Sequence, residues 1–298
     1  MANRRAIVTL ATGDEYEHFW ETYCEPNWVP YADRIGCDLI RLSEPLDTSE
    51  RARGRSPSWQ KCLILGLDFA SRYEQIIWID SDIIINLAAA PDIVGDCPRE
   101  RVGAVFTGAH IADWAVPVIL DRVLRQPAQT SGVAELVEAT RRNYAAYGLS
   151  NPPDVMVQCG TLVLSPAHHR EMLERIYETP HYPSNTRQYE QPPLSYEVLT
   201  KDMHYPLDGR FNYTFFEQLY AHYPFLVDSA SFRRLGEICA SPGMAGPLPM
   251  AAYQQLLQHA MVSEFYNSYF FHLAGALKMA PYLPSSLFKM APPDLYPA

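Results

Sequence analysis

The sequence predicts an α/β protein with an open, mixed but mostly parallel sheet flanked by helices. Short apolar runs typical of strands alternate with helical segments through the first third of the chain, and such alternation is typical of parallel strands joined by crossovers. The run 75–80 is apolar on consecutive residues, which indicates a strand covered on both faces. The 298 residues are 48% hydrophobic and 19% charged, so the chain has ample apolar surface for a core.

The elements of the first half follow from local signals. Ser58 is a plausible N-cap for a helix whose apolar residues recur at helical spacing, and Pro26 and Pro30 act as breakers in a helical, acidic stretch. The expected order is strand 5–11, helical stretch 14–35, strand 37–42, polar loop 43–58, helix 59–71, strand 75–80, strand 101–108 and helical stretch 111–150.

The second half is richer in loops. It contains an apolar strand over 155–165, an amphipathic helix over 168–178 and a Pro- and Tyr-rich stretch over 179–215 with one short helix. No clear linker separates these parts, so we expect a single domain over 1–278. The tail 279–298 contains five prolines and is expected to pack as an irregular strap.

Charge and cysteine content exclude some classes of function. The net charge of −10 argues against nucleic-acid binding, which depends on neutralising phosphates. No run of 18 apolar residues exists, so no transmembrane helix is expected, and the start lacks a signal-peptide pattern. The six cysteines form no CxxC pair and are expected to be buried thiols of a reduced compartment. The expected location is the cytoplasm.

The segment IIWIDSDIII (76–85) is the most informative in the chain. Asp80 and Asp82 interrupt an apolar run, and buried carboxylates are costly unless they are paired or bind metal. On an extended chain, residues two apart point to one side, so the carboxylates can converge at the carboxyl end of a strand, where open α/β sheets bind ligands. Oxygen ligands at this spacing suit Mn²⁺ or Mg²⁺. The alternative interpretation is a strand-ending turn with solvated aspartates.

With these residues in view, the chain resembles the GT-A glycosyltransferases, most closely the retaining family 8, with some likeness to family 34. The resemblance starts in RAIVTLATGD (5–14) and continues through Trp59-Gln60-Lys61 to IIWIDSD. The later segments that look like family motifs are VMVQCGTLVLS (155–165), YEQPPL (189–194), LDGRFNYT (207–214) and FFHLAGALK (270–278). They stand in family order, and this order is more specific than any one motif.

The resemblance implies a divalent cation, Mn²⁺ or Mg²⁺, and a nucleotide-diphosphate sugar as donor. Asp80, Asp82 and His272 would be the metal ligands; the alternative for His272 is a core histidine with one hydrogen bond. The domain is expected to have a nucleotide-binding half over about 1–110 and an acceptor-binding half over about 111–278. The residues expected to bind the donor are Thr9, Ala11, Thr12, Asp14, Tyr16, Lys61, Asp80, Ser81, Gln158, Gly275 and Lys278. The alternatives for Lys61 and Lys278 are exposed surface lysines, and Gln158 stands where the family has an asparagine.

Three residues are expected at the reaction centre. Glu190 and Gln191 match the family's Asp-Gln pair near the anomeric carbon, where a carboxylate or amide could stabilise oxocarbenium-like charge. Asp208 and Asn212 would contact donor or acceptor sugar, and nearby aromatic residues, Tyr205, Phe211, Tyr213 and Phe215, would form an acceptor wall or part of the core.

The predicted function is therefore transfer of a hexose, most simply from UDP-glucose or UDP-galactose, to a glycan or other hydroxyl acceptor, with retention. Two alternatives remain at this level. One is a nucleotide-sugar-binding protein without transferase activity. The other is a sugar nucleotidyltransferase, which would be expected to carry a Gly-rich, basic phosphate loop near the N-terminus, whereas residues 9–16 contain one glycine and no Lys or Arg.

Overall fold

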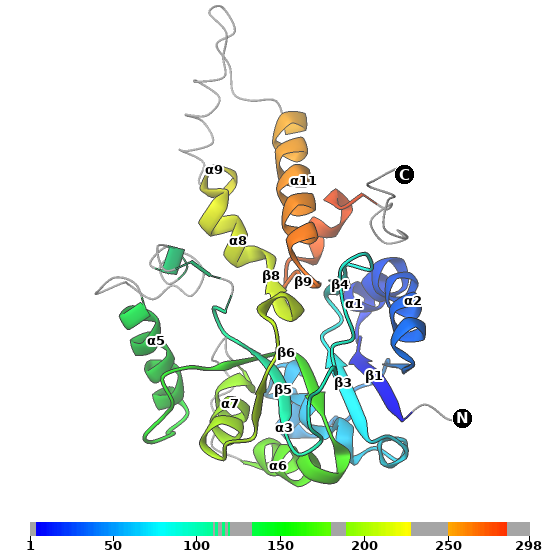
Figure 1. Cartoon of the computed structure of the whole chain (residues 1–298), viewed down its shortest axis with the longest axis vertical. Coiled ribbons are helices and arrows are strands. Elements are labelled where there is room, and N and C mark those ends of the chain that lie inside the picture. The colour runs from blue at the N-terminus through cyan, green and yellow to red at the C-terminus, as the bar shows by residue number, and fades with distance from the viewer. Residues whose placement is uncertain are drawn as a thin grey trace, which may run out of the picture.

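The computed structural model describes residues 4–109, 111–112, 115–116, 119, 133–179, 189–227 and 250–284. Two sheets organise these residues (Figure 1). The larger has the strand order β2-β1-β3-β6-β5-β7 and the smaller the order β4-β9-β8. The strands are β1 (Arg5–Leu10), β2 (Asp38–Leu42), β3 (Gln75–Ile79), β4 (Ile83–Ile85), β5 (Val102–Phe106), β6 (Val157–Leu164), β7 (His204–Pro206), β8 (Tyr213–Thr214) and β9 (Phe270–His272).

The larger sheet is mixed, and this confirms the predicted fold class. β1 runs parallel to both β2 and β3, and β5 runs parallel to β7. β6 lies antiparallel between β3 and β5. The helices around it are α1 (Asp14–Phe19), the π-helix η1 (Trp20–Cys24), α2 (Glu25–Ile35), α3 (Glu50–Arg53), the 3-10 helices η2 (Pro57–Gly66) and η3 (Ala70–Arg72), α5 (Val133–Ala146), α6 (Pro166–Glu178) and α7 (Gln191–Thr200).

Both faces of β3 are covered, as its unbroken apolar run predicts. Ile77 and Ile79 join a core cluster that includes residues of α2, β4, β9 and α11 (Met250–Asn267). Ile76 and Trp78 join the opposite cluster, beneath η2 and α6. Alternate residues of a strand point to opposite faces, so each face of the sheet has its own core.

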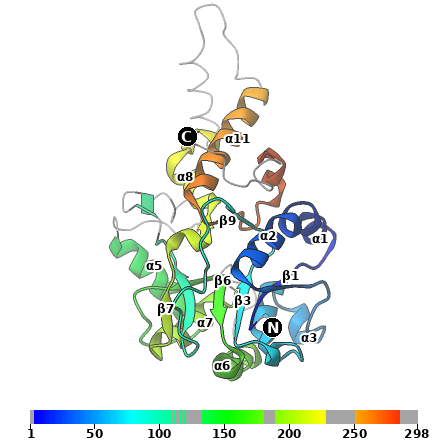
Figure 2. The ribbon, with the colours of Figure 1, turned by 45° about the vertical axis from the view of Figure 1, so that its right-hand side comes forward.

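The remaining helices stand beyond one end of the larger sheet, away from α6 (Figure 2). They are α8 (Phe215–His222), α9 (Pro224–Val227), α11 and the 3-10 helices η5 (Gly209–Asn212) and η6 (Leu277–Tyr282). None of the helices in the described ranges combines the length and the apolar character needed to cross a bilayer.

Three details of the local predictions are wrong. Pro26 and Pro30 do not break the helical stretch, because Pro26 stands in the first turn of α2 and Pro30 lies inside it. The segment 59–71 is not an α-helix: η2 begins at Pro57, and its N-cap is Ser56, whose hydroxyl accepts from the Ser58 backbone N–H. Pro57 explains the earlier start, because its fixed φ and missing N–H suit the first turn of a helix. The helical spacing of the apolar residues did not distinguish an α-helix from a 3-10 helix.

The cysteine prediction holds for the described residues. Cys24, Cys37, Cys62, Cys97 and Cys159 are buried free thiols. Burial raises the pKa of each of them above its ordinary value, which favours the unreactive thiol form. Cys239 and most of the proline-rich tail, 285–298, lie outside the described residues.

Candidate active site

Asp80, Ser81 and Asp82 form the short connection between β3 and β4 (Figure 1). The Asp80 backbone N–H donates to the Gly160 carbonyl at 2.8 Å, and Ser81 Oγ donates to the Leu10 carbonyl at 3.1 Å. The connection is therefore tied to β6 on one side and to the end of β1 on the other. The carboxylates do converge, but through a turn and not along an extended strand as the spacing predicted.

His272 reaches this turn because of the smaller sheet. It lies opposite Ile83 in the β4–β9 pairing and beside Thr214 in the β8–β9 pairing. One ligand atom from each of Asp80, Asp82 and His272 lies within 4.8 Å of the others. Two aspartates that are two positions apart and a histidine 190 positions after the second of them thus form one cluster.

Gly160 makes room for the histidine. A Cβ at this position would lie 2.8 Å from His272 Cε1 and 3.0 Å from Asn212 Nδ2. Real Cβ atoms do not approach side chains so closely, so a larger residue on β6 would displace the imidazole. The glycine noted in the strand 155–165 is a packing requirement of the cluster.

Asn212 orients the imidazole and is not free to bind sugar. Its Oδ1 lies 2.7 Å from His272 Nδ1, and since an amide oxygen only accepts, Nδ1 is the donor. This leaves Nε2 facing Asp82, whose Oδ1 is 3.2 Å away. A ring nitrogen fixed in this way is the usual arrangement of a metal-binding histidine.

The charges of the cluster favour a bound cation. Burial would lower the pKa of His272, but the carboxylates of Asp82 and Asp80 raise it above its ordinary value. Burial would raise the pKa of Asp82, but His272 and the Gly275 N–H lower it below its usual range. Two carboxylates and one imidazole form a donor set that fits Mn²⁺.

Lys61 is buried and is not on the exposed face of a helix. Its Nζ lies 3.0 Å from Asp80 Oδ1, 2.8 Å from Glu190 Oε1 and 2.9 Å from the Cys159 carbonyl. Burial would lower the pKa of Lys61, but Asp80 and Glu190 raise it well above its ordinary value. Lys61 is therefore a charged ammonium group that links Asp80 to the start of α7.

The residues expected at the end of β1 differ in accessibility. Thr9 and Ala11 are wholly buried, whereas Thr12 and Tyr16 are half-buried and Asp14 is exposed. Burial raises the pKa of Tyr16, and the charges of Asp82 and Asp80 raise it further, so this ring lies on the metal side of α1. Only Thr12, Asp14 and Tyr16 offer side chains to a ligand here.

The other predicted donor contacts have specific places. The Gly275 N–H donates to Asp82 Oδ2 at 3.2 Å, and Gly275 has φ +80°, which suits glycine. Lys278 is exposed on η6. Gln158 is buried in β6. Ser81 is buried with its hydroxyl on Leu10.

The residues predicted at the reaction centre are only partly brought together. Glu190 precedes α7 and contacts Lys61, and Gln191 Nε2 donates to Thr107 Oγ1 at 3.2 Å. Asp208 caps η5 and pairs with Arg210 at 2.7 Å; among the described residues it contacts neither Glu190 nor the metal cluster. Of the two alternatives for the aromatic residues, Phe211, Tyr213 and Phe215 follow the second, because they are buried in the core.

Sequence reasoning missed Trp78. Its Nε1–H donates to Asp80 Oδ1 at 2.7 Å. The signal was available, because residues two apart on a strand share a face and Trp78 precedes Asp80 by two.

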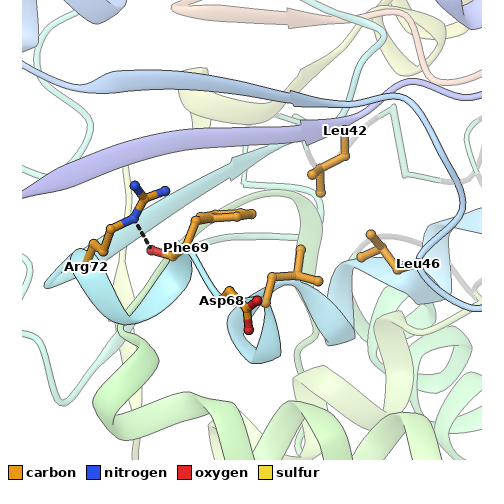
Figure 3. Close-up of a pocket in the computed structure, with 6 residues that line it drawn as sticks. Leu42, Leu46, Asp68, Phe69 and Arg72 are labelled. Carbon is orange, nitrogen blue, oxygen red and sulfur yellow. Dashed lines mark hydrogen bonds between the residues drawn. The ribbon is translucent and has the colours of Figure 1, made fainter.

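A hollow of about 610 Å³ lies away from this cluster, between the end of β2 and η3 (Figure 3). Its lining is mostly aliphatic and aromatic. Arg72 Nε donates to the Phe69 carbonyl at its edge. The lining residues are Leu42, Leu46, Leu67, Asp68, Phe69 and Arg72. None of the predicted site residues is among them, so we assign this hollow no role in the site.

No protein-family model and no curated protein matches the sequence. Among solved structures, the chain is similar to a glycosyltransferase involved in glycosylation of the major capsid of PBCV-1, with 14% identity, a TM-score of 0.47 and coverage of 92% of this chain and 100% of that one. It is also similar to the bifunctional glycosyltransferase WbbM, with 13% sequence identity and a TM-score of 0.46, and this match covers 92% of this chain but only 46% of that one. Mouse xyloside xylosyltransferase 1 is similar with 9% sequence identity and a TM-score of 0.39, and the match covers 90% of this chain and 96% of that one. At such identities function does not transfer.

Proposed function

We propose that this protein is a metal-dependent glycosyltransferase that moves a hexose from a nucleotide-diphosphate sugar to a hydroxyl acceptor. The observation that carries the proposal is the cluster of Asp80, Asp82 and His272 at the carboxyl ends of the central strands. The ordered motifs of the sequence, which resemble those of GT-A family 8, support UDP-glucose or UDP-galactose as donor and retention as the stereochemical course. They also support a donor half over 1–110 and an acceptor half over 111–278.

The residues of the cluster would hold Mn²⁺ or Mg²⁺ through two carboxylates and the Nε2 of His272. When bound, the cation would neutralise the charge that develops on the departing diphosphate. The protein supplies the arrangement around it: Asn212 fixes the imidazole, and the Gly275 N–H fixes Asp82.

Around this centre, exposed groups would bind the donor. Thr12, Asp14 and Tyr16 would contact the nucleoside at the end of β1, and Lys278 would reach the diphosphate as a point charge. Gln191, at the N-terminus of α7, would turn its amide toward the sugar and stabilise positive charge at the anomeric carbon. Asp208, accessible beside Arg210, would contact the acceptor.

The experiment measures binding by calorimetry against UDP-, GDP-, CMP- and dTDP-sugars, with and without Mn²⁺, for the wild type and for Asp82→Asn. We expect Mn²⁺-dependent binding of one nucleotide class, lost in the variant, followed by slow metal-dependent hydrolysis of that donor. Binding without hydrolysis or transfer to any acceptor would favour a nucleotide-sugar-binding protein. Absence of binding with Mn²⁺ would overturn the proposal.

A further inference from the structure

The ammonium group of Lys61 has no hydrogen left for a ligand. A lysine Nζ carries three hydrogens, and its partners are Asp80 Oδ1, Glu190 Oε1 and the Cys159 carbonyl, all at 2.8–3.0 Å. The side chain is only 3% exposed. Contact with a diphosphate would require the loss of one of these three bonds inside the protein.

The two oxygens of Asp80 are in different states. Oδ1 receives the Trp78 Nε1–H at 2.7 Å and lies 3.0 Å from Lys61 Nζ. No hydrogen bond from the described residues reaches Oδ2, and the side chain is 26% exposed. Two donors on one oxygen fix the plane of the carboxylate and leave the other oxygen without a protein donor.

The carboxylates of this region outnumber the ammonium groups that contact them. The carboxylates are those of Asp80, Asp82 and Glu190, and Glu190 is 4% exposed with Oε2 lacking a partner. The cation that contacts two of them is Lys61. With His272 neutral, two negative charges remain, which equals the charge of one Mn²⁺.

We propose that Lys61 and Trp78 are positioning residues that hold Asp80 by Oδ1 and present Oδ2 to the cation. Glu190 is the buried counter-ion of Lys61. This inference rests on the metal site of the proposed function, and it replaces the sequence-based expectation that Lys61 faces the donor and Glu190 the anomeric carbon. It predicts that Lys61 and Trp78 set the affinity for the metal alone, before any nucleotide binds.

The test measures the affinity for Mn²⁺ alone, by calorimetry and by the electron paramagnetic resonance signal of free Mn²⁺. Trp78→Phe removes one donor and keeps an aromatic ring, and we expect its Mn²⁺ affinity to fall about tenfold. The control is Tyr31→Phe, which removes a buried aromatic donor to the Pro91 carbonyl away from the cluster. Its affinity should stay within twofold of the wild type.

Lys61→Met separates positioning from donor contact. If Lys61 positions Asp80, the affinity for Mn²⁺ alone falls at least tenfold, while the affinity for UDP at saturating Mn²⁺ is retained. If Lys61 contacts the diphosphate, Mn²⁺ alone binds unchanged and UDP binds more weakly, which would overturn the inference. If circular dichroism shows that Lys61→Met does not fold, the Mn²⁺ affinity of Trp78→Phe, compared with that of Tyr31→Phe and the wild type, tests the positioning role instead.

The outcomes also separate this inference from the proposed function. A wild-type protein that binds no Mn²⁺ contradicts both. A wild type that binds Mn²⁺, with Trp78→Phe and folded Lys61→Met binding equally well, contradicts the positioning role alone and leaves the metal site standing.

Discussion

Glu264 and Asp80 are carboxylates in two different regions of the molecule, and their oxygens are satisfied differently. Glu264 on α11 receives the Tyr213 hydroxyl on Oε2 at 2.6 Å and the Tyr223 hydroxyl on Oε1 at 2.8 Å. Burial, and then Glu264 itself, raise the pKa of Tyr213 above its ordinary value, so this hydroxyl stays protonated and donates. At the other region, Asp80 has both of its protein donors on one oxygen.

The difference distinguishes a structural carboxylate from a ligand. Glu264 connects α11 to β8 and to the end of α8, and both of its oxygens are used by the protein. A buried charge with all its bonds made contributes to a unique packing. Asp80 keeps one oxygen without a donor from the described residues on a side chain that is 26% exposed, so this oxygen is available to a ligand.

The largest expected effect tests the ligand side of this comparison. Asp82→Asn removes a charged ligand, so Mn²⁺ binding should fall below detection by calorimetry, while the melting temperature changes less than in Glu264→Gln. The reason is that an asparagine can keep both contacts of Asp82, by accepting from the Gly275 N–H and donating to His272 Nε2, whereas both partners of Glu264 are hydroxyl donors. A variant that binds Mn²⁺ like the wild type would show that Asp82 is not a ligand.

Glu264→Gln makes the same change of charge at the structural carboxylate. We expect a loss of about 2 kcal/mol in the free energy of unfolding, because hydrogen bonds to a charged group contribute roughly 1.5–3 kcal/mol. Chemical denaturation measures this loss. The affinity for Mn²⁺ should not change; a parallel fall in both quantities would mean that the two regions are coupled and the comparison fails.

Asn212→Ala tests a residue that contacts the proposed ligand His272 without being a ligand itself. Without its amide the imidazole of His272 loses its orientation, and loss of such a partner weakens metal binding by about tenfold to a hundredfold. Calorimetry with Mn²⁺ measures the change. The matched control is Asn86→Ala, another buried asparagine, which donates to the Phe265 and Ser268 carbonyls and should leave the affinity unchanged.

The smallest effect is the dependence of metal affinity on pH. Asp82 and Asp80 raise the pKa of His272 against burial, so the imidazole keeps its proton to a higher pH than usual. Mn²⁺ must displace that proton. Its affinity should therefore be full above this raised pKa and fall about tenfold per pH unit below it. Titrations in buffers of different ionisation enthalpy would show release of about one proton; a flat profile would contradict the role of His272.

The sequence predicted much of the fold and the composition of the site, for identifiable reasons. The consecutive apolar residues of β3 indicate a strand with two covered faces, and each face does have its own core. Asp80, Asp82 and His272 were identified from their types, spacing and motif order. Helix type was not predictable: the apolar pattern before Leu67 gives no sign that η2 is a 3-10 helix.

The roles of the site residues, unlike their residue types, depend on contacts between segments that are far apart in the sequence. The sequence cannot show that Asn212 would meet His272 and not a sugar, because the contact depends on β8 pairing with β9. Nor can it show that all three hydrogens of Lys61 are used, since the partners come from β3, β6 and the start of α7.

The sequence by itself therefore determined the strands β1, β2, β3, β5 and β6, the residues that are apolar enough to be buried and the carboxylates that have to be neutralised. These properties depend on residue type and on neighbours within a few positions. The sequence did not predict the short strands β4, β7, β8 and β9. The tertiary structure alone decided which oxygen of Asp80 is occupied and which is open. That choice depends on Trp78 and Lys61 approaching the same oxygen from two different elements, and no local pattern encodes the direction of approach.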